Sequence, residues 1–404
     1  MTDRLRILSI STMFPNPRMP VHAQFVKQRL DALSAKADLI VVSPIPWFPG
    51  EGYVPRYANR SRITSQTNAN AYPTYFPKFF SFPRVLKPLD GIFLAVAVWK
   101  FVAAHRLRDR IDVLDCHLGF PEGFAGALLS RMLGKPYVVT LRGHDINDLP
   151  RFPVRIRQVL FALRHSARYF GVARALVNEA VRLGAPPEKG FASTNGVDTV
   201  RFRPTPKAHA RTTLGLNGAS RYMLSVSHLV PRKGVDILLQ ALALLRTAGH
   251  TDLCFIVVGQ GGEEGDCEAD LRALATELGI ADAVVWAGAV HNTDLHVWYS
   301  AADVFCLASE KEGWPNVVLE AMACGTPVVA HRTWGVPEII PRQDLGILVG
   351  TREPAAFADA IGVALNQAWD LDRLRAHALE NTWDKVADGL LQHFQAIAQS
   401  DRPR

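Results

Sequence analysis

Short apolar runs typical of β-strands alternate with helical patterns along most of this chain. The strand-like runs are RILSIST, ADLIVVSP, DVLDCH, PYVVTLRG and ARYFGVA, and then RYMLSVS, LCFIVVGQG, VVWAGAV, DVFCLAS and TPVVAHR. Strands that alternate with helices in this way predict βαβ units and parallel sheets. Because the alternation occurs twice, we expect an α/β fold with two domains, each built on a parallel sheet.

The alternation is interrupted at NGVDTVRFRPTP, residues 195–206, where turn residues replace the apolar pattern. A chain of 404 residues also exceeds one comfortable core. We therefore predict a first domain over residues 1–200 and a second over residues 207–380. The remainder, residues 381–404, has a helical pattern with no strand after it, and we expect this helix to return to the first domain.

Charge is distributed unevenly between the two halves. Residues 1–205 hold 29 Lys and Arg against 14 Asp and Glu, and the rest of the chain holds 16 against 24, so the net charge is +7. The first half could face anionic lipid, an anionic acceptor or nucleic acid. The sequence has no helix-turn-helix, zinc-finger spacing or basic-aromatic RNA motif, so we do not expect nucleic acid as a partner.

The cysteines and the apolar segments bear on location. The five cysteines are scattered, odd in number and never spaced as CxxC, which predicts reduced thiols in a cytosolic protein and no zinc site. The start, MTDRLRILSIST, lacks the apolar core of a signal peptide. The longest apolar stretch, residues 91–104, is too short to span a bilayer and is expected to be a buried helix. Any membrane contact should be peripheral, on the inner face of the cell membrane.

A basic turn follows the first strand-like run of the second half, in SVSHLVPRKGVDILLQAL. Ligands of open parallel sheets bind beyond the carboxyl ends of the strands. Arg232 and Lys233 lie in such a position, at a helix start, where two adjacent cations could hold a phosphate. Gly234 follows them as though the backbone had to come close to a ligand. A solvated basic turn would give the same pair.

A glycine-rich turn, VVGQGGEEGD, follows the next strand-like run. Gly259 and Gly261 fit the start of a dinucleotide fingerprint, but Glu264 stands where the third glycine is needed. This mismatch disfavours a nicotinamide oxidoreductase. By themselves the two glycines indicate a tight turn that would let a base or a ribose lie against the chain.

Residues 309–330, SEKEGWPNVVLEAMACGTPVVA, combine a loop, a short helix and a buried strand. Pro315 suits the first helical position and Gly325 a C-cap. Glu320 then falls in the first two turns of the helix, and Glu312 just before it. Two carboxylates beside a helix N-terminus predict a site where a carboxylate holds hydroxyls and backbone N–H groups hold an anion.

The spacing Glu312-x7-Glu320, followed by AMACGTPVV, resembles that of the retaining GT-B glycosyltransferases of family 4. The resemblance extends to SVSHLVPRKG, VVGQGG, DLHVWYSAADVFCLAS, WGVPEII and DLGILV, and so covers nearly all of residues 221–350. The first half is similar more loosely, through FPNPRMPVHAQFVKQRL, HLGFPEG, TLRGHDIN and NGVD. The chain looks most like the subgroup that builds exopolysaccharide or teichuronic-type surface polymers.

This resemblance implies a GT-B fold, in which two Rossmann-like domains face a central cleft and the C-terminal helix packs back across the domains. It also implies roles for the two glutamates. Glu312 would lie against hydroxyls of the donor sugar and help to position it. Glu320 would accept hydrogen bonds from the ribose hydroxyls.

The resemblance further implies how the nucleoside diphosphate is held. Backbone N–H groups around Asn316 and Val317 would bind the diphosphate, and Lys233 matches the phosphate-binding lysine. Gly259 and Gly261 match the loop beside the nucleoside. No metal and no cofactor are implied, and the acidic Asp-x-Asp at residues 370–372 is better explained as a helix cap.

Some positions depart from the family pattern. His228 stands where the family often has an arginine, so phosphate binding would rely on Lys233, with Arg232 or His228 itself. Ala23 is the nearest match to a glycine of the first loop that faces the donor phosphates. Trp334 stands where a glycine is common.

In TLRGHDIN the family often has a histidine at the position of Arg142. Either Arg142 or His144 could face the acceptor or the donor sugar, and we take His144 with Glu312 and Lys233 as the catalytic candidates. A structural pair of His144 and Asp145 is about equally compatible with the sequence. His117, at the end of a strand, could lie on the acceptor side or be a buried or capped histidine.

The acceptor side is indicated less clearly. Residues 151–170, RFPVRIRQVLFALRHSARYF, mix arginines with apolar side chains. Such a basic amphipathic helix could lie on an anionic membrane near a lipid-linked acceptor, or could simply pack on the first sheet.

The sequence therefore predicts a retaining glycosyltransferase that moves a hexose-type sugar from a UDP- or GDP-sugar to a growing surface polysaccharide or lipid-linked glycan. The chemistry needs charge stabilisation at the leaving phosphate, which preorganised cations and N–H groups provide. The alternatives are a degenerate GT-B scaffold, a nucleotide-sugar epimerase, or a phosphorylase, for which no pyridoxal-phosphate motif is present.

Overall fold

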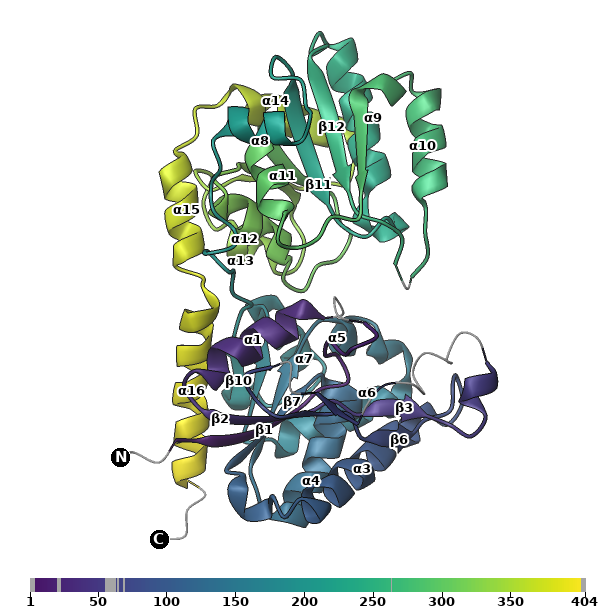
Figure 1. Ribbon diagram of the computed structural model, residues 1–404, viewed down its shortest axis with the longest axis vertical. Coiled ribbons are helices and arrows are strands. Elements are labelled where there is room, and N and C mark those ends of the chain that lie inside the picture. The colour runs from purple at the N-terminus through teal and green to yellow at the C-terminus, as the bar shows by residue number, and fades with distance from the viewer. Residues whose placement is uncertain are drawn as a thin grey trace. The chain divides into compact units, whose positions relative to one another are not determined.

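The computed structural model describes residues 4–19, 23–54, 63, 65–67, 70–262 and 264–400. The chain forms two compact units, of which the first comprises Met1–Asn195 with Trp383–Arg404 and the second Gly196–Thr382. Each unit is built on a parallel sheet with helices on its faces (Figure 1). The predicted class, α/β with two Rossmann-like domains, is confirmed, and each of the ten predicted strand runs contains a strand.

The first unit contains the following elements. Its strands are β1 (Arg6–Ile10), β2 (Asp38–Val42), β3 (Ile45–Trp47), β4 (Gln66–Thr67), β5 (Thr74–Tyr75), β6 (Lys78–Phe80), β7 (Val113–His117), β8 (Tyr137–Leu141), β9 (Arg168–Gly171) and β10 (Gly190–Ala192). Its α-helices are α1 (Gln24–Ser34), α3 (Asp90–Ala104), α4 (Phe124–Leu133), α5 (His144–Asn147), α6 (Pro153–His165), α7 (Arg174–Arg182) and α16 (Trp383–Ser400).

The main sheet of the first unit has the strand order β10-β9-β8-β7-β1-β2-β5-β4, and its neighbouring strands are parallel except β4 and β5. Successive residues of β1 enter different cores: Ile7 packs with α1 and α16, and Leu8 packs with α3 and α4. Figure 1 shows α16 beside α1. Because helices cover both faces, the strands are largely apolar, although β7 also carries the buried Asp115 and His117.

The second unit contains the following elements. Its strands are β11 (Arg221–Val226), β12 (Leu253–Val258), β13 (Val284–Gly288), β14 (Val304–Leu307), β15 (Val328–His331) and β16 (Ile347–Val349). Its α-helices are α8 (Lys207–Thr213), α9 (Val235–Thr247), α10 (Glu268–Glu277), α11 (Leu295–Ala301), α12 (Asn316–Ala323), α13 (Val336–Ile339), α14 (Pro354–Asn366) and α15 (Leu371–Leu379).

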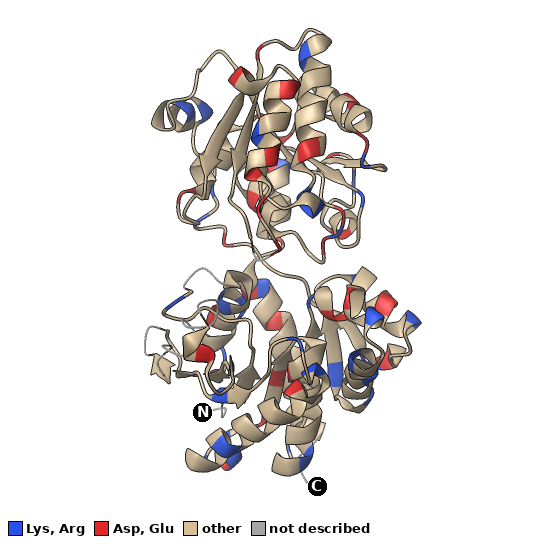
Figure 2. Ribbon diagram, turned by 90° about the vertical axis from the view of Figure 1, so that its right-hand side faces the viewer, with Lys and Arg blue, Asp and Glu red and all other residues tan. Residues whose placement is uncertain are grey.

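The sheet of the second unit has the order β13-β12-β11-β14-β15-β16, and all its neighbouring strands are parallel. On one face, Phe255 packs with apolar residues of α9, α10 and α14. On the other face, the Tyr299 ring of α11 lies 5.6 Å from the ring of Phe305. Charged residues lie mainly on the helices and loops, and the strands are largely uncharged (Figure 2).

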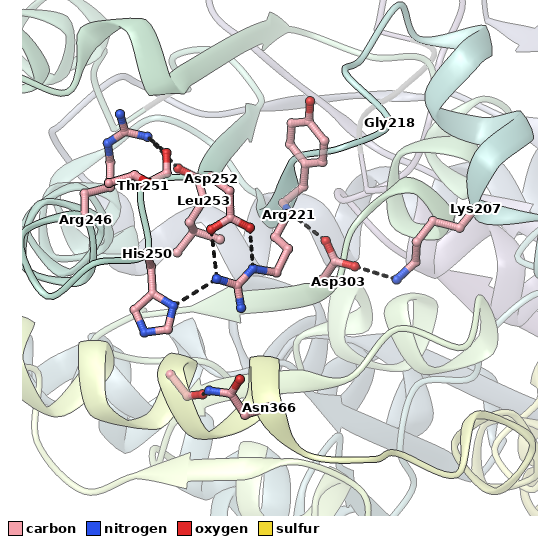
Figure 3. Close-up of polar contacts among 12 residues, drawn as sticks. Lys207, Gly218, Arg221, Arg246, His250, Thr251, Asp252, Leu253, Asp303 and Asn366 are labelled. Atoms are coloured by element: carbon pink, nitrogen blue, oxygen red, sulfur yellow. Dashed lines mark hydrogen bonds and ion pairs between the residues drawn. The ribbon is translucent and has the colours of Figure 1, made fainter.

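Ion pairs tie together the edge of the second sheet where its strands begin (Figure 3). Arg221, the first residue of β11, donates to both carboxylate oxygens of Asp252 and to Nδ1 of His250. Asp303 accepts a hydrogen bond of 2.7 Å from Lys207 of α8. These charges are paired with one another, so this edge is occupied by structural contacts.

The local predictions for helix ends in the second half are confirmed. The predicted helix after Pro315 is α12, and Gly325 follows it with φ of +76°, as a C-terminal glycine should. Asp370 caps α15 by accepting a hydrogen bond from the backbone N–H of Arg373, as predicted. None of the described helices is both long and apolar enough to cross a membrane.

The prediction that residues 91–104 form a buried helix is wrong for one of its faces. The segment is α3, and Leu94 and Val98 are fully buried in it. However, the side of the helix with Ile92, Val96 and Trp99 is open to solvent, and these residues are 41%, 40% and 40% exposed. A helix that is apolar all round is expected to be covered all round, but among the described residues of the protein only those on the sheet side of α3 cover it.

Candidate functional site

The strand order of the second sheet reverses between β11 and β14. From β11 the chain proceeds outward through β12 and β13 on one side, and from β14 through β15 and β16 on the other. In open α/β sheets, ligands bind beyond the carboxyl ends of the strands at such a reversal. The segments that follow these two strands, residues 227–234 and 308–315, carry the predicted cations and Glu312.

An ion pair joins the two segments. Nζ of Lys233 lies 2.5 Å from Oε1 of Glu312, and the two side chains are 14% and 12% exposed. Gly234 has φ of +69°, and a Cβ there would lie 2.4 Å from the carbonyl oxygen of Ala308. Only glycine fits such an approach, so it brings the backbones together and lets the predicted lysine and glutamate meet.

Glu320 lies on α12, one helical turn into the helix. The hydroxyl of Tyr299 donates to Oε2 of Glu320 at 2.9 Å. Burial raises the pKa of Glu320 to about 7, against the opposing effects of this hydrogen bond and of the positive charge of Arg201. The carboxyl group therefore titrates near neutral pH, and the tyrosine fixes its orientation. Tyr299 was not foreseen, although it lies in the DLHVWYSAADVFCLAS run.

The predicted diphosphate-binding amides belong to the first turn of α12, since the helix begins at Asn316 and continues with Val317. Backbone N–H groups of a first turn point out of the helix end and carry partial positive charge. In the preceding loop, the indole N–H of Trp314 is buried without a hydrogen-bond partner. A buried donor of this kind has a place for an acceptor, and sequence analysis missed it.

The glycine-rich turn after β12 is shaped by packing. Gly259 has φ of +144°, and a Cβ there would lie 1.8 Å from the carbonyl oxygen of Ser227. A Cβ on Gly261 would lie 2.5 Å from the side chain of Asp266. The next glycine, Gly262, packs against the ring of His228. Gly259 and Gly262 thus allow the turns after β11 and β12 to pack together, with the His228 ring of the first turn against the second, while Gly261 lets the loop after β12 fold closely on Asp266.

Arg232 has a different neighbour from Lys233. Its guanidinium donates to both oxygens of Glu264, at 2.5 and 2.8 Å, on the surface. Its backbone carbonyl accepts a hydrogen bond from the N–H of Glu310. Lys233 is therefore in direct contact with Glu312. The Arg232 side chain instead pairs with Glu264, the residue at the position of the third glycine of the dinucleotide fingerprint.

A second polar group lies at the corresponding edge of the first sheet, whose order reverses between β1 and β7. Arg29 of α1 lies 3.2 Å from Asp115 of β7, and both side chains are almost fully buried. Burial opposes ionisation of Asp115, but Arg29 and His117 outweigh it and hold its pKa well below the usual range. Nη2 of Arg142 lies 2.9 Å from Nδ1 of His117, which joins Arg142 to this cluster.

These contacts determine the tautomer of His117. An arginine can only donate, so Nδ1 of His117 accepts from Arg142 and the ring proton is on Nε2. Nε2 lies 3.0 Å from both Asp115 and Ser9. Burial lowers the pKa of His117 to about 4, although Asp115 opposes the shift. His117 is therefore a buried neutral histidine that holds Arg142 in place, while Nη1 of Arg142 donates to Asn195.

The other two predicted residues of this unit lie in different settings. Ala23 has φ of +48°, a left-handed conformation that favours glycine, and precedes α1. The ring of Phe25, two residues later, lies 5.1 Å from the guanidinium carbon of Arg142. His144 instead has a 65% exposed side chain and pairs with Asp148 at 2.8 Å.

The suggested structural pair of His144 and Asp145 is wrong. Asp145 accepts hydrogen bonds from the backbone N–H groups of Gly119, Arg142 and Gly143. It thus joins the segments that follow β7 and β8. The i to i+4 spacing on α5 directs His144 to Asp148 instead of to its neighbour.

Glu122 is a buried residue that sequence analysis did not single out. Its Oε1 accepts hydrogen bonds from the backbone N–H and the hydroxyl of Thr12, at 2.7 and 2.6 Å, and its Oε2 is buried without a partner. Burial raises its pKa to about 7, against the hydrogen bonds from Thr12. Glu122 therefore joins the segments after β1 and β7, at the reversal of the first sheet. The acidic residue within HLGFPEG was the available signal.

Metal-ligand clusters and grooves among the described residues also bear on the site. No group of three or more His, Cys, Asp or Glu there could hold a metal ion. A groove of about 850 Å³ lies between α9 and α14, and His250 and Asn366 line it (Figure 3). None of the predicted site residues lines this groove, so it is separate from the candidate site.

Two family profiles match the chain. Residues 207–382 match the profile of "Glycosyl transferases group 1", and residues 28–196 match that of a "Glycosyl transferase 4-like domain". D-inositol 3-phosphate glycosyltransferase from Acidothermus cellulolyticus is 38% identical over 340 residues, which cover 78% of this chain and 75% of that protein. D-inositol 3-phosphate glycosyltransferase 1 from Catenulispora acidiphila is 30% identical over 313 residues, which cover 72% and 74%.

Solved structures agree with the fold. Sucrose-phosphate synthase from Thermosynechococcus elongatus has a TM-score of 0.79 at 19% identity, over 98% of this chain and 100% of that one. Anabaena HepE in complex with UDP has a TM-score of 0.74 at 20% identity, over 97% and 100%. With the profile matches, these likenesses establish the GT-B fold of two Rossmann-like domains.

The buried charge cluster leads to a prediction for stability. Asp115→Asn should destabilise the first unit by about 3–5 kcal/mol, because the buried Arg29 loses its charged partner. The matched control is Asp38→Asn, whose side chain is 62% exposed and lies 3.5 Å from Arg4. Loss of that surface pair should cost less than about 1 kcal/mol. Urea denaturation measures the free energy of unfolding of both variants. An equal loss in the two variants would contradict the buried ion pair of Arg29 and Asp115.

Proposed function

The chain belongs to the group 1 glycosyltransferases, with a glycosyl transferase 4-like N-terminal domain, and from this premise we propose its donor, acceptor and stereochemistry. It transfers a sugar from a UDP- or GDP-sugar to a growing surface polysaccharide or lipid-linked glycan, with retention of anomeric configuration. The observation that carries the proposal is the ion pair of Lys233 and Glu312 at the strand-order reversal, beside the first turn of α12.

The diphosphate of the donor binds between Lys233 and the amides of Asn316 and Val317. An ammonium group has three N–H donors, so Lys233 can keep its bond to Glu312 and still donate to a phosphate oxygen. Glu312, held by this bond, accepts hydrogen bonds from hydroxyls of the sugar. The buried N–H of Trp314 in the same loop supports an oxygen-rich ligand there, since it lacks an acceptor of its own.

Glu320 takes the ribose. Tyr299 donates to one oxygen of its carboxylate, and a carboxylate has lone pairs for further donors. The two ribose hydroxyls are such donors. Metal-independent chemistry suits this arrangement, because Lys233 and the helix amides supply positive charge where the leaving phosphate develops negative charge.

In the transfer step, the acceptor oxygen bonds to the anomeric carbon of the sugar. The bond from that carbon to the diphosphate breaks, and the nucleoside diphosphate leaves with the electron pair. A phosphate oxygen on the same face takes the acceptor proton, so no second carboxylate is needed as a base.

The acceptor side lies at the reversal of the first sheet. The guanidinium groups of Arg29 and Arg142 lie here with the carboxylates of Asp115 and Asp145, while His117 is neutral. A guanidinium is a fork of N–H donors that suits an acceptor carrying phosphate, such as a lipid-linked glycan. We include in the proposal that the enzyme is cytosolic and works peripherally at the inner face of the membrane.

A second candidate acceptor is an inositol phosphate. The relatives from Acidothermus cellulolyticus and Catenulispora acidiphila are both named D-inositol 3-phosphate glycosyltransferases, and the first is 38% identical to this chain. Phosphate is common to both candidate acceptors, so the arginine donors at this reversal suit either. They differ in size and in the need for a membrane.

Thermal unfolding with saturating UDP, GDP, ADP and NAD identifies the donor base. A nucleoside diphosphate at about 100 times its Kd should stabilise the protein by about 2.7 kcal/mol. We expect UDP or GDP to do so, and Glu320→Ala to weaken the effect. No stabilisation by any nucleoside diphosphate would contradict the donor site and favour a degenerate scaffold, and stabilisation by NAD alone would favour an epimerase.

The titration of Glu320 predicts how donor binding depends on pH. The pKa of Glu320 is raised to about 7, so below that pH the carboxyl group of the free protein carries a proton. The ribose hydroxyls need the ionised carboxylate as acceptor, so this proton must leave when the ribose binds. UDP affinity should therefore rise roughly tenfold from pH 6 to pH 8, as a group of this pKa ionises. In Glu320→Gln this gain should be lost, whereas titration of the nucleotide itself affects both proteins. Calorimetry measures UDP affinity at both pH values. The same change of affinity with pH in wild type and in Glu320→Gln would refute the ribose contact.

Assays with the two acceptors test the reaction. Labelled UDP- and GDP-sugars are offered with a bacterial lipid extract or with D-inositol 3-phosphate, and NMR coupling constants give the anomeric configuration of the product. Glu312→Gln should lower kcat on the order of 100-fold, as loss of a preorganised group does. The control is Glu310→Gln, whose side chain is 53% exposed, and it should keep wild-type activity. Inversion would contradict the stereochemistry, and transfer to inositol phosphate alone would replace the glycan acceptor.

A further inference from the structure

Helix α3 presents apolar side chains to the solvent. Seven of the large apolar residues that are more than a third exposed fall between residues 82 and 99. They are Phe82, Val85, Leu86, Leu89, Ile92, Val96 and Trp99. A helix with apolar residues on every side is normally enclosed by protein or lipid. This concentration on one segment is therefore an unpartnered surface and not the scattered exposure that any protein shows.

The exposed residues of α3 form one stripe. Ile92, Val96 and Trp99 follow the spacing of i, i+4 and i+7, which places them on one side of a helix. The opposite side packs on the first sheet through Leu94 and Val98. Figure 1 shows α3 next to β6 and α4, which contact it.

The turn before α3 extends the stripe. Val85 and Leu86 are the most exposed apolar residues of the segment, at 55% and 57%. Arg84 and Leu86 have φ of +66° and +54°, which side chains other than glycine rarely adopt. Such backbone costs on the order of 1 kcal/mol or more, and it cannot be explained by burial of these side chains.

The start of α6 adjoins this turn. The side-chain amide of Gln158 donates to the carbonyl oxygen of Pro88 at 2.8 Å. Phe152 and Val154 are 38% and 52% exposed there. The guanidinium carbon of Arg155 lies 3.6 Å from the centre of the Phe152 ring. Residues 82–100 and 151–157 thus form one continuous patch, which we call the α3 surface.

Charge on the α3 surface has one sign. Its basic residues are Arg84, Lys87, Lys100, Arg151, Arg155 and Arg157. The acidic residue within these two segments is Asp90, which is 6% exposed and pairs with Lys87 at 2.5 Å. The exposed apolar stripe therefore lies among basic side chains without exposed carboxylates from the same segments.

We propose that the α3 surface docks on a membrane that contains anionic lipids. Apolar and aromatic side chains enter the boundary between headgroups and acyl chains, and arginines and lysines around them pair with lipid phosphates. A second copy of this chain fits less well, because a symmetric contact would bring the same basic residues against one another. An acidic lipid surface supplies both the apolar depth and the opposite charge.

This inference rests on the membrane partner in the proposed function and gives it a defined surface. The sequence pattern pointed to residues 151–170, of which only the start belongs to the α3 surface; Val159, Ala162 and Leu163 of α6 are buried. The larger contribution comes from residues 82–99. Docking by peripheral insertion of one helix face requires no spanning segment.

Cosedimentation with vesicles tests the inference, without donor or acceptor. The probes are phosphatidylcholine vesicles with 30% phosphatidylglycerol and vesicles of phosphatidylcholine alone, at about 0.15 M salt. We expect the wild-type protein to bind the anionic vesicles at least tenfold more strongly. Leu86→Ser with Trp99→Ser should lower this binding at least tenfold. Arg84→Gln with Arg157→Gln should lower binding to the anionic vesicles and leave binding to the neutral vesicles unchanged.

The matched control is Leu244→Ser with Val363→Ser. These residues are 47% and 56% exposed on the second unit, so the change in surface polarity is similar. Equal binding of anionic vesicles by the control and the wild type supports the α3 surface. An equal loss of binding in the control and in Leu86→Ser with Trp99→Ser overturns it. Absence of wild-type binding to anionic vesicles also overturns it, as does a concentration-dependent dimer that Leu86→Ser with Trp99→Ser abolishes. Stabilisation by UDP in every variant separates failure of docking from failure of the donor site.

Discussion

Parallel strands in both units run in one direction and are buried on both faces, so polar residues of the chain collect where the strands end. In β1, Ile7 and Leu8 enter opposite cores, which leaves no solvent-facing side for polar groups. The loops that follow the strands therefore carry most of the candidate site residues of each unit. The opposite edge of the second sheet has paired charges instead, as Arg221 and Asp252 illustrate.

At each reversal of strand order, a contact joins the two diverging loops. In the second unit it is the ion pair of Lys233 and Glu312, and in the first it is the hydrogen bonding of Thr12 to Glu122. Both contacts bind side chains from loops far apart in sequence. A ligand at either reversal therefore meets groups that the fold has already positioned, which lowers the cost of ordering them on binding. The proposed transfer depends on this preorganisation at the second reversal.

The sequence was most informative where a local rule acts alone. Strand alternation gave both sheets, and Asp370 was correctly interpreted as a helix cap because capping depends on the next three residues. Where the outcome depends on distant neighbours, a prediction went wrong: residues 91–104 were expected to form a buried helix, and one side of that helix is exposed. Composition and spacing do not say which side of a helix the rest of the protein covers.

The sequence by itself determined the two α/β domains, the order of their strands along the chain and the motif with Glu312 and Glu320, since these follow from periodicity and spacing. Only the tertiary structure decided that Glu312 meets Lys233, that Tyr299 donates to Glu320, and that Arg142 makes His117 a neutral acceptor. Those contacts join residues 20 or more positions apart, and their distances and burial set the pKa values. Such pairings arise from packing, which no local pattern encodes.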